Sequence, residues 1–296
     1  MIHSARSLGD KIFDLVIILL LFGIVIVVAY PLWFVVIASF SDPLEVVSGR
    51  VVFLPRNFNI RGYELIINNE QIWLGYRNTI LYTTVGLFFN MTLTTLGAYA
   101  LACRTLPGRK VLLLIIMFTM YFSGGMIPDY LLVRNLGMLN TIWAMVLPPA
   151  VSVFNLIIMR TYFINFPSEL LEAARIDGCS IFGALFKIVL PLSKPVLAVI
   201  LLFYGVGHWN EFFRGMIYIT DRNMLPLQLV LRNILLEGTR LGVEDIMQDE
   251  AAFARIMTAE TMRYGAIIVS SVPVLLLYPF LQKYFVKGVM IGALKG

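Results

Sequence analysis

Charged residues are scarce in this sequence of 296 residues: Asp, Glu, Lys and Arg make up only 14%, whereas 59% of the residues are hydrophobic. The mean hydropathy is +0.84. A chain of this composition has too little polar surface to cover a water-soluble globule. We therefore expect an integral membrane protein. Its net charge of +5 is explained by basic residues that face anionic lipid and cytoplasm, so we expect no nucleic-acid partner.

Cysteine and histidine are also rare, with two residues of each. We expect Cys103 and Cys179 to lie at cytoplasmic helix ends, where a reducing compartment keeps thiols free. His3 and His208 are too few and too far apart in the sequence for a metal site. The sequence therefore predicts neither a disulfide nor a bound metal.

Motifs for nucleotide binding and catalysis are missing as well. The sequence has no GxxxxGK[ST] loop and no recognisable nucleophile motif. We expect no enzyme activity and no cofactor on this chain. If ATP and Mg²⁺ are used, another subunit must bind them.

Long apolar stretches without charge indicate the fold. Each approaches the roughly 20 residues that a spanning helix needs, although the third and fifth are short. They predict an all-α integral membrane fold with six transmembrane helices. The stretches are Leu15–Ser41, Asn78–Cys103, Val111–Pro128, Asn135–Met159, Pro195–Asn210 and Tyr264–Gln282.

The lysines predict the orientation, because under a six-span topology all of them fall on the side of the two termini. The short loop from Arg104 to Lys110, on the same side, is basic and has no acid. By the positive-inside rule this side is cytoplasmic, so both termini are predicted in the cytoplasm. The lysines are Lys11, Lys110, Lys187, Lys194, Lys283, Lys287 and Lys295.

One membrane domain, 13–282, accounts for most of the chain. A cytoplasmic stub, 1–12, precedes it, and a cytoplasmic tail, 283–296, follows. Loops longer than about 15 residues are usually functional or disordered. We therefore interpret the long outer loop, 214–263, as a docking surface.

A polar elbow at 164–194 is predicted as two short helices joined at a glycine. Ser168 is placed to cap the first helix, Gly178 to take the left-handed conformation, and Ser180 to cap the second helix. Pro191 disfavours a helical Leu190 and is expected to end the second helix there. One apolar face is predicted on that helix, made of Ile181, Phe182, Leu185, Phe186 and Val189.

The spacing within this elbow resembles the EAA loop of bacterial ATP-binding-cassette (ABC) importer permeases. Glu172-Ala173-Ala174 is followed by three residues, Gly178, nine residues and then Ile188 to Pro191. Many fixed positions and gaps agree, which makes the match specific; an ordinary interfacial helix pair is the simpler alternative. The resemblance implies that the following residues couple the chain to an ATPase: Glu172, Ala173, Ala174, Asp177, Gly178, Leu190 and Pro191.

The resemblance covers nearly the whole chain and is greatest to the carbohydrate permeases of the maltose and lipoprotein-type oligosaccharide group, which includes importers of alginate fragments. It is carried by Tyr30-Pro31, Ser39 to Pro43, Arg77-Asn78-Thr79, Phe122 to Pro128, Asn155 to Tyr162, Pro191 to Pro195, His208-Trp209-Asn210 and Pro226-Leu227-Gln228. A type I importer fold in the bacterial plasma (inner) membrane is implied. The implied partners are a second permease subunit in a heterodimer, two ATPase subunits, an outside solute-binding protein, membrane lipid and an oligosaccharide.

In such an importer the elbow would be seated in a cleft of the ATPase. The resemblance implies that Glu172 makes a polar contact there, that Ala173 and Ala174 permit close approach, and that Gly178 sets the elbow angle. It also implies that the tail after Lys283 contacts the ATPases.

The sugar path is predicted from aromatic, amide and carboxylate side chains, which suit sugar binding. Each candidate is equally compatible with a structural role, because buried polar side chains in spans often bond a neighbouring helix. In the maltose system the partner permease carries most sugar contacts. The candidates are Asn90, Tyr121, Asn155, Tyr204, Trp209, Asn210 and Glu211.

Other functions stay open at this point. Arginines on the outer side, Arg50, Arg56, Arg61, Arg232 and Arg240, favour an acidic sugar, but nearby acids offset them and a plain solvated surface explains them too. A permease for a non-sugar solute shares the same coupling motif. An ion-coupled secondary transporter would place ionisable residues near the middle of the spans, which have almost none.

Overall fold

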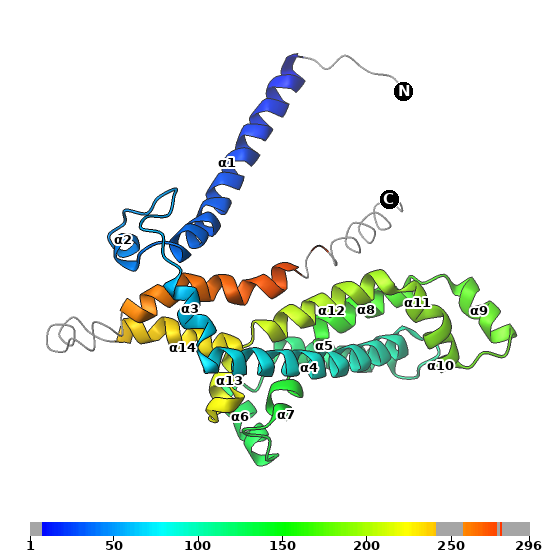
Figure 1. Ribbon diagram of the computed structural model, residues 1–296. Helices are drawn as coiled ribbons and strands as arrows, with labels where there is room; N and C mark the ends of the chain where they lie inside the picture. The colour runs from blue at the N-terminus through cyan, green and yellow to red at the C-terminus, as the bar shows by residue number, and fades with distance from the viewer. Residues whose placement is uncertain (1–7, 241–256, 277–278, 280–296) are drawn as a thin grey trace. The chain divides into compact units, whose positions relative to one another are not determined.

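The computed structural model describes residues 8–240, 257–276 and 279, and every regular element in these ranges is a helix (Figure 1). The chain divides into two units. One consists of Met1–Asn69 with Asn233–Ser270, and the other of Glu70–Arg232 with Ser271–Gly296. The predicted tail, 283–296, lies outside the described residues, as does 241–256 of the predicted outer loop.

The first unit is dominated by α1 (Leu8–Ser39), a helix of 32 residues that is long and apolar enough to cross a membrane. This confirms the first predicted span. After α1 come α2 (Pro43–Val47) and α3 (Arg61–Ile67), and most of a helix at 257–276 also belongs to this unit, which ends at Ser270. The hydroxyl of Ser41 donates to the carbonyl of Ile37 at 2.6 Å and accepts from the backbone N–H of Arg56 at 3.2 Å, which holds the connecting segment against the end of α1.

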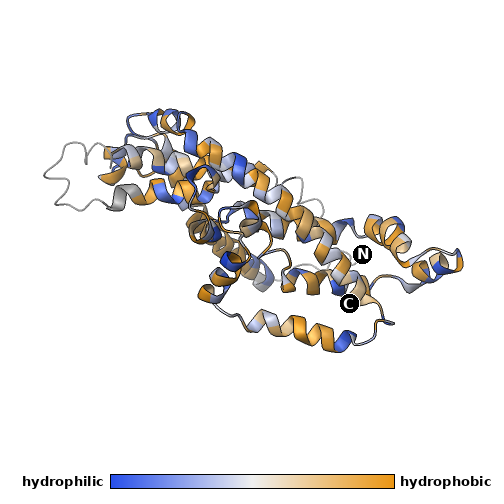
Figure 2. Ribbon diagram, turned by 90° about the horizontal axis from the view of Figure 1, so that it is seen from below, coloured by the Kyte–Doolittle hydropathy of each residue, from blue (hydrophilic) through white to orange (hydrophobic). Residues whose placement is uncertain are grey.

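The second unit is built around α4 (Glu70–Ala102), which is also long and apolar enough to span a membrane. This confirms the second predicted span. Figure 2 shows that apolar residues recur along the helices, as expected for helices that face lipid. The remaining long helices of this unit are α5 (Arg109–Tyr121), α6 (Met126–Asn135), α8 (Val153–Ile164) and α12 (Lys194–Trp209), and α14 (Leu227–Arg240) begins in it.

Several predicted spans are bent or broken. α5 and α6 are long enough to cross a membrane only when taken together, and the chain bends by 112° between them. The helix at Ile181–Leu192 bends by 84° into α12. Within the described residues, two helices are long enough to cross a membrane, or up to four if each bent pair is one span. The first bend falls at Gly125, whose φ of +87° suits only glycine, next to the Ser123-Gly124 pair.

The fourth predicted span, Asn135–Met159, is not one continuous helix, so the prediction of an unbroken helix there is wrong. The structure has a short helix, α7 (Ile142–Val146), then six non-helical residues at 147–152, and then α8. Pro148 and Pro149 explain the break, because proline lacks a backbone N–H and clashes with the preceding helical turn.

Two buried stripes run along α4 and α12, with a buried side chain at every fourth residue, the spacing that keeps residues on one helix face. The two helices pack on each other, and α8 packs on both. The α4 stripe is Tyr82, Gly86, Asn90, Thr94 and Ala98, and the α12 stripe is Val196, Ile200, Tyr204 and His208.

Gly86→Ala is expected to lower the melting temperature of the purified chain. A Cβ at this position would overlap Nε2 of His208, so α4 and α12 would have to separate. Overpacking of this kind costs about 1–3 kcal/mol. The matched control is Gly23→Ala in α1, where no atom of the described chain lies within 4 Å of the added Cβ. Thermal unfolding followed by tryptophan fluorescence is the measurement, and equal melting temperatures for the two variants would contradict the packing argument.

Candidate functional site

The elbow lies at one end of α4, and α13 (Phe213–Tyr218) lies at the other (Figure 1). It consists of α9 (Ser168–Ile176), α10 (Ile181–Ala184), a wide π-helical turn η1 (Leu185–Val189) and α11 (Leu190–Leu192). Gly178 joins α9 to α10 with φ of +74°. Ser180 caps α10 by accepting the N–H of Gly183 at 3.1 Å. Both predictions for these residues are confirmed.

Two other predictions for the elbow are wrong. Pro167 occupies the cap position of α9, so Ser168 is its first helical residue and makes no capping hydrogen bond. Helical structure also continues through Pro191 to Leu192. The π turn explains this continuation: the N–H of Leu190 reaches back to the carbonyl of Leu185, and the widened turn relieves the clash that a proline makes with a regular helix.

The predicted apolar face of the second helix is divided between two environments. Leu185 and Val189 are buried, at 0% and 1% exposed, in one core with Ile200 of α12. Ile181 and Phe182 are 61% and 66% exposed, and Phe186 is exposed as well. The chain itself therefore covers only part of the predicted face, the part at Leu185 and Val189.

The Glu-Ala-Ala motif is divided in the same way. Ala174 is buried at 5% exposed, and its carbonyl accepts the N–H of Cys179 at 2.8 Å, which closes the turn after α9. Glu172 and Ala173 are exposed, and so is Gly178. The two alanines thus face different ways. Of the remaining predicted coupling residues, Asp177 and Pro191 are exposed and Leu190 is half-buried.

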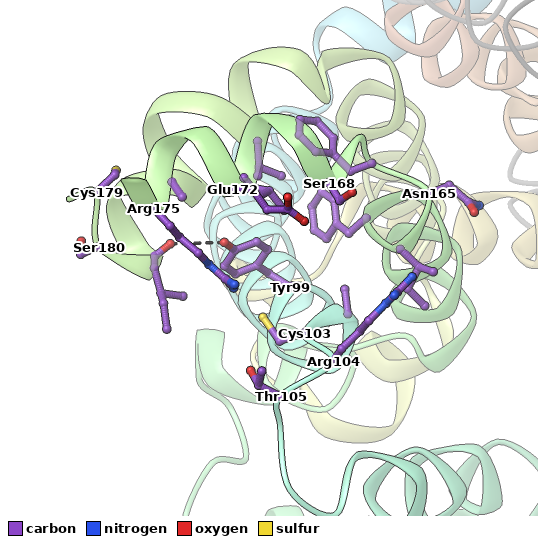
Figure 3. Close-up of a pocket in the computed structure, with 18 of the residues that line it drawn as sticks. Tyr99, Cys103, Arg104, Thr105, Asn165, Ser168, Glu172, Arg175, Cys179 and Ser180 are labelled. Atoms are coloured by element: carbon purple, nitrogen blue, oxygen red, sulfur yellow. Dashed lines mark hydrogen bonds between the residues drawn. The ribbon is translucent and has the colours of Figure 1, made fainter. Parts of the chain in front are cut away.

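A cavity of about 530 Å³ lies behind the elbow, between α9, α10, the end of α8 and the end of α4. Figure 3 shows Glu172 and Arg175 of α9 directed towards Tyr99 of α4. The hydroxyl of Tyr99 donates to the carbonyl of Ile181 at 3.3 Å, which ties the elbow to α4. Both cysteines, Cys103 and Cys179, are free and border this cavity.

Two arginines hold the end of α4 beside the cavity. Nε of Arg160 donates to the carbonyl of Leu101 at 3.2 Å, and Nη1 of Arg109 donates to that of Ala102 at 3.4 Å. They satisfy carbonyls that a helix end leaves without intrahelical partners. The sequence interpretation missed this role, although a basic residue near a helix C-terminus is its usual signal.

The predicted sugar-path residues do not form one cluster. Asn90, Asn155, Tyr204 and Trp209 are buried at 0%, 5%, 7% and 9% exposed, whereas Tyr121 is 76% exposed on α5. Asn90 and Tyr204 are brought together, because both bond the break between α7 and α8.

Two further candidates follow α12. Asn210 is exposed and accepts a hydrogen bond from Gln228 at 3.4 Å, and Glu211 is ion-paired with Arg214. His208, which the sequence interpretation set aside, is 6% exposed and bonds Asn90. Its place four residues after Tyr204 was the available signal. Among the residues that the structure describes, no group of three or more His, Cys, Asp or Glu could hold a metal ion.

The opposite end of α4 fixes the start of the outer loop. Asn78 donates to the carbonyls of Asn223 and Leu225 at 2.7 and 3.1 Å, and Tyr82 donates to that of Met224 at 2.7 Å. Thr79 accepts the N–H of Leu227 at 2.8 Å. The docking role of this loop stays a prediction.

An all-helical, strongly apolar chain with an exposed glycine elbow at one end has the features of a transporter's membrane subunit. The chain belongs to the binding-protein-dependent transport system inner membrane component family, whose model matches residues 72–291. It is therefore a transport permease subunit and not itself an enzyme.

Its relatives are similar over their full lengths. It is 40% identical to the polygalacturonan/rhamnogalacturonan transport system permease protein YtcP of Bacillus subtilis (strain 168), covering 97% of this chain and 99% of that protein. It is 39% identical to protein LplC of the same organism, covering 99% and 98%. A chain from the crystal structure of a bacterial ABC transporter involved in the import of the acidic polysaccharide alginate is 34% identical and superposes with a TM-score of 0.86, over 95% of this chain and 99% of that one. The predicted type I permease fold is thereby confirmed.

Ala174→Leu and Ala173→Leu form a matched pair that tests the two orientations. Ala174 is buried, so a leucine there is expected to displace α9 from the residues packed against it. The turn closed by the hydrogen bond from Cys179 would then open. Leucine at 173 is expected to leave the turn closed, because Ala173 is exposed. The measurement is the rate of maleimide modification of Cys179 in a Cys103→Ser background. Similar rates in the two variants would show that the alanines are not oriented differently.

Proposed function

We propose that this chain is one of two permease subunits of an ATP-driven importer that moves an oligosaccharide across the membrane. The similarity to YtcP over nearly the whole of both chains carries this proposal. The second permease subunit would be a different chain, and two ATPase subunits would bind ATP and Mg²⁺. A solute-binding protein would deliver the sugar from outside.

An acidic oligosaccharide is the substrate class that the relatives favour. The name of YtcP gives polygalacturonan and rhamnogalacturonan, and the similar crystal structure belongs to an importer of alginate. These polymers share carboxylate-bearing sugar units. The outer arginines add little support, because Arg50 is paired with Glu45 at 3.2 Å and Arg232 lies over the ring of Phe212.

The elbow would carry the coupling to ATP hydrolysis. Glu172 and Ala173 are exposed on α9, and Ile176 beside them is 87% exposed, an unusual position for a large apolar side chain. A protein surface that covers them would bury apolar area and pair the carboxylate of Glu172. Because Leu185 and Val189 are buried in one core with Ile200, force on this elbow would be transmitted to α12.

The topology proposed with this function places the elbow and both termini in the cytoplasm. The distribution of lysines supports it, since all of them fall on one side of a six-span chain. The plasma membrane of a bacterium, called the inner membrane where an outer one exists, is the corresponding location.

The decisive experiment reconstitutes the chain with its partner permease and ATPases in liposomes. Hydrolysis of ATP is then measured with the solute-binding protein alone, or loaded with oligogalacturonate, alginate oligomers or neutral arabinooligosaccharides. We expect the loaded protein to stimulate hydrolysis, with the acidic oligomers most effective. Stimulation by the neutral sugar alone would overturn the acidic class, and hydrolysis that ignores the binding protein would overturn the importer.

Gly178→Val is expected to reduce the stimulated hydrolysis to the basal rate in this assay. A β-branched residue is strained at φ of +74°, so the angle between α9 and α10 would change. Gly178→Asn is the matched control, because asparagine tolerates the left-handed region, and it should keep most of the stimulation. Equal loss in both variants would mean that the backbone angle at this position does not carry the coupling.

A further inference from the structure

The break at 147–152 places non-helical backbone inside a segment that the sequence marks as a span. Lipid offers no hydrogen bonds, so such backbone is tolerated only where protein or a water-filled cavity satisfies it. The partners of this break are therefore informative about its role.

Asn90 of α4, 0% exposed, bonds the middle of the break. Its side-chain nitrogen donates to the carbonyl of Pro149 at 2.7 Å and to that of Ala150 at 2.9 Å. Both amide hydrogens are then used, and the amide oxygen is left as an acceptor. It lies 2.7 Å from Nε2 of His208, so this nitrogen must carry the histidine proton.

Tyr204 of α12 bonds the second half. Its hydroxyl oxygen accepts the backbone N–H of Ser152 at 2.8 Å and lies 2.7 Å from Oγ1 of Thr94. Either hydroxyl can donate in the bond between Tyr204 and Thr94. We call Asn90, Thr94, Tyr204 and His208 the clamp: two residues of α4 and two of α12 that together hold the break.

Helix α12 joins the clamp to the elbow, and α4 is tied to the elbow as well. Tyr204 and His208 continue the buried stripe of Val196 and Ile200 on α12. Val196, Ile200 and Tyr204 lie in the same core as Leu185 and Val189 of the elbow. A displacement of the elbow that moves α12 would therefore also move the residues that hold the break.

The other side of the break is open. Leu147 and Val151 are 40% and 42% exposed, whereas Ala150 between them is buried at 9%. The break is thus held on one side by its own chain and free on the other to face a partner or the transported molecule. A gating element needs this arrangement: one side must be attached to the helix that moves it, and the other must be unattached so that it can open or close the path.

We propose that the break at 147–152 is a gate of the translocation path and that the clamp makes it move with α12 when the elbow is displaced. This inference rests on the proposed function. Asn90 and Tyr204 then act as positioning residues, in place of the sugar contact predicted from the sequence. In known transporters, alternating access is produced by the rigid-body movement of one group of helices, and discontinuous helices line the transport site.

The test uses the complete complex in lipid nanodiscs, with Val151→Cys supplying this chain's only cysteine after Cys103→Ser and Cys179→Ser. A charged, water-soluble maleimide is added to the nucleotide-free complex and to the complex trapped with ATP and vanadate. We expect the modification rates in the two states to differ by about fivefold or more, the lower range of measured couplings between sites. Equal rates would overturn the gate.

Tyr204→Phe tests the clamp in the same assay, because phenylalanine keeps the ring and removes the hydroxyl that holds Ser152. The difference between the two states should fall to about twofold or less, below the usual range of such couplings. Thr94→Val removes the other partner of that hydroxyl and should reduce the difference in the same direction, which keeps the test valid if Tyr204→Phe fails to fold. Tyr130→Phe is the matched control, because the Tyr130 hydroxyl has no hydrogen bond within the described ranges, and it should preserve the full difference.

Persistence of the difference in both clamp variants would overturn the clamp. Failure of the proposed function is distinguishable from these results. If loaded binding protein stimulates ATP hydrolysis but the thiol introduced by Val151→Cys reacts equally in both states, the importer stands and the gate is wrong. If stimulation is absent but the reactivity of that thiol still differs between the two states, the gate stands and the assigned substrate or partner is wrong.

Discussion

The absence of water in a membrane is the constraint on which the second unit depends, because every non-helical backbone group that lies within the lipid needs a protein partner. α4 supplies several of these partners. At one end, Asn78, Thr79 and Tyr82 bond the segment at 223–227, and near the middle Asn90 bonds the break at 147–152. The polar side chains of α4 therefore determine where the chain can leave helical structure. Their burial explains why a spanning helix carries so many of them.

The sequence predicted those features that depend on local chemistry. The first two spans follow from apolar length, and the turn at Gly178 follows from the conformational freedom of glycine. The broken fourth segment was missed because its residues are as apolar as a span, although Pro148-Pro149 is a visible signal. The roles of His208 and Arg160 depend on contacts with residues distant in the sequence, His208 with Asn90 and Arg160 with Leu101. A single sequence shows the helical spacing of His208 but does not identify these distant partners.

The elbow shows how a short motif serves two surfaces. Ala174 and its backbone carbonyl close the turn within the chain, while Ala173 is exposed and Glu172 is exposed where it borders the cavity. The next helix repeats this division, with Leu185 buried and Ile181 exposed. The buried residues connect the elbow to α12. The exposed residues can therefore differ between permeases to fit different partners without weakening that connection.

The two arginines at the end of α4 have a consequence for biogenesis. Arg109 belongs to the short basic loop that marks the proposed cytoplasmic side, and its guanidinium also bonds the last turn of α4. In the proposed topology, that positive charge would retain the loop on the near side of the membrane while the chain is being inserted. Once the helix has formed, the same charge completes the hydrogen bonds of the helix end. Arg109 would thus first help to set the orientation of the loop during insertion and then stabilise the end of α4 in the folded chain.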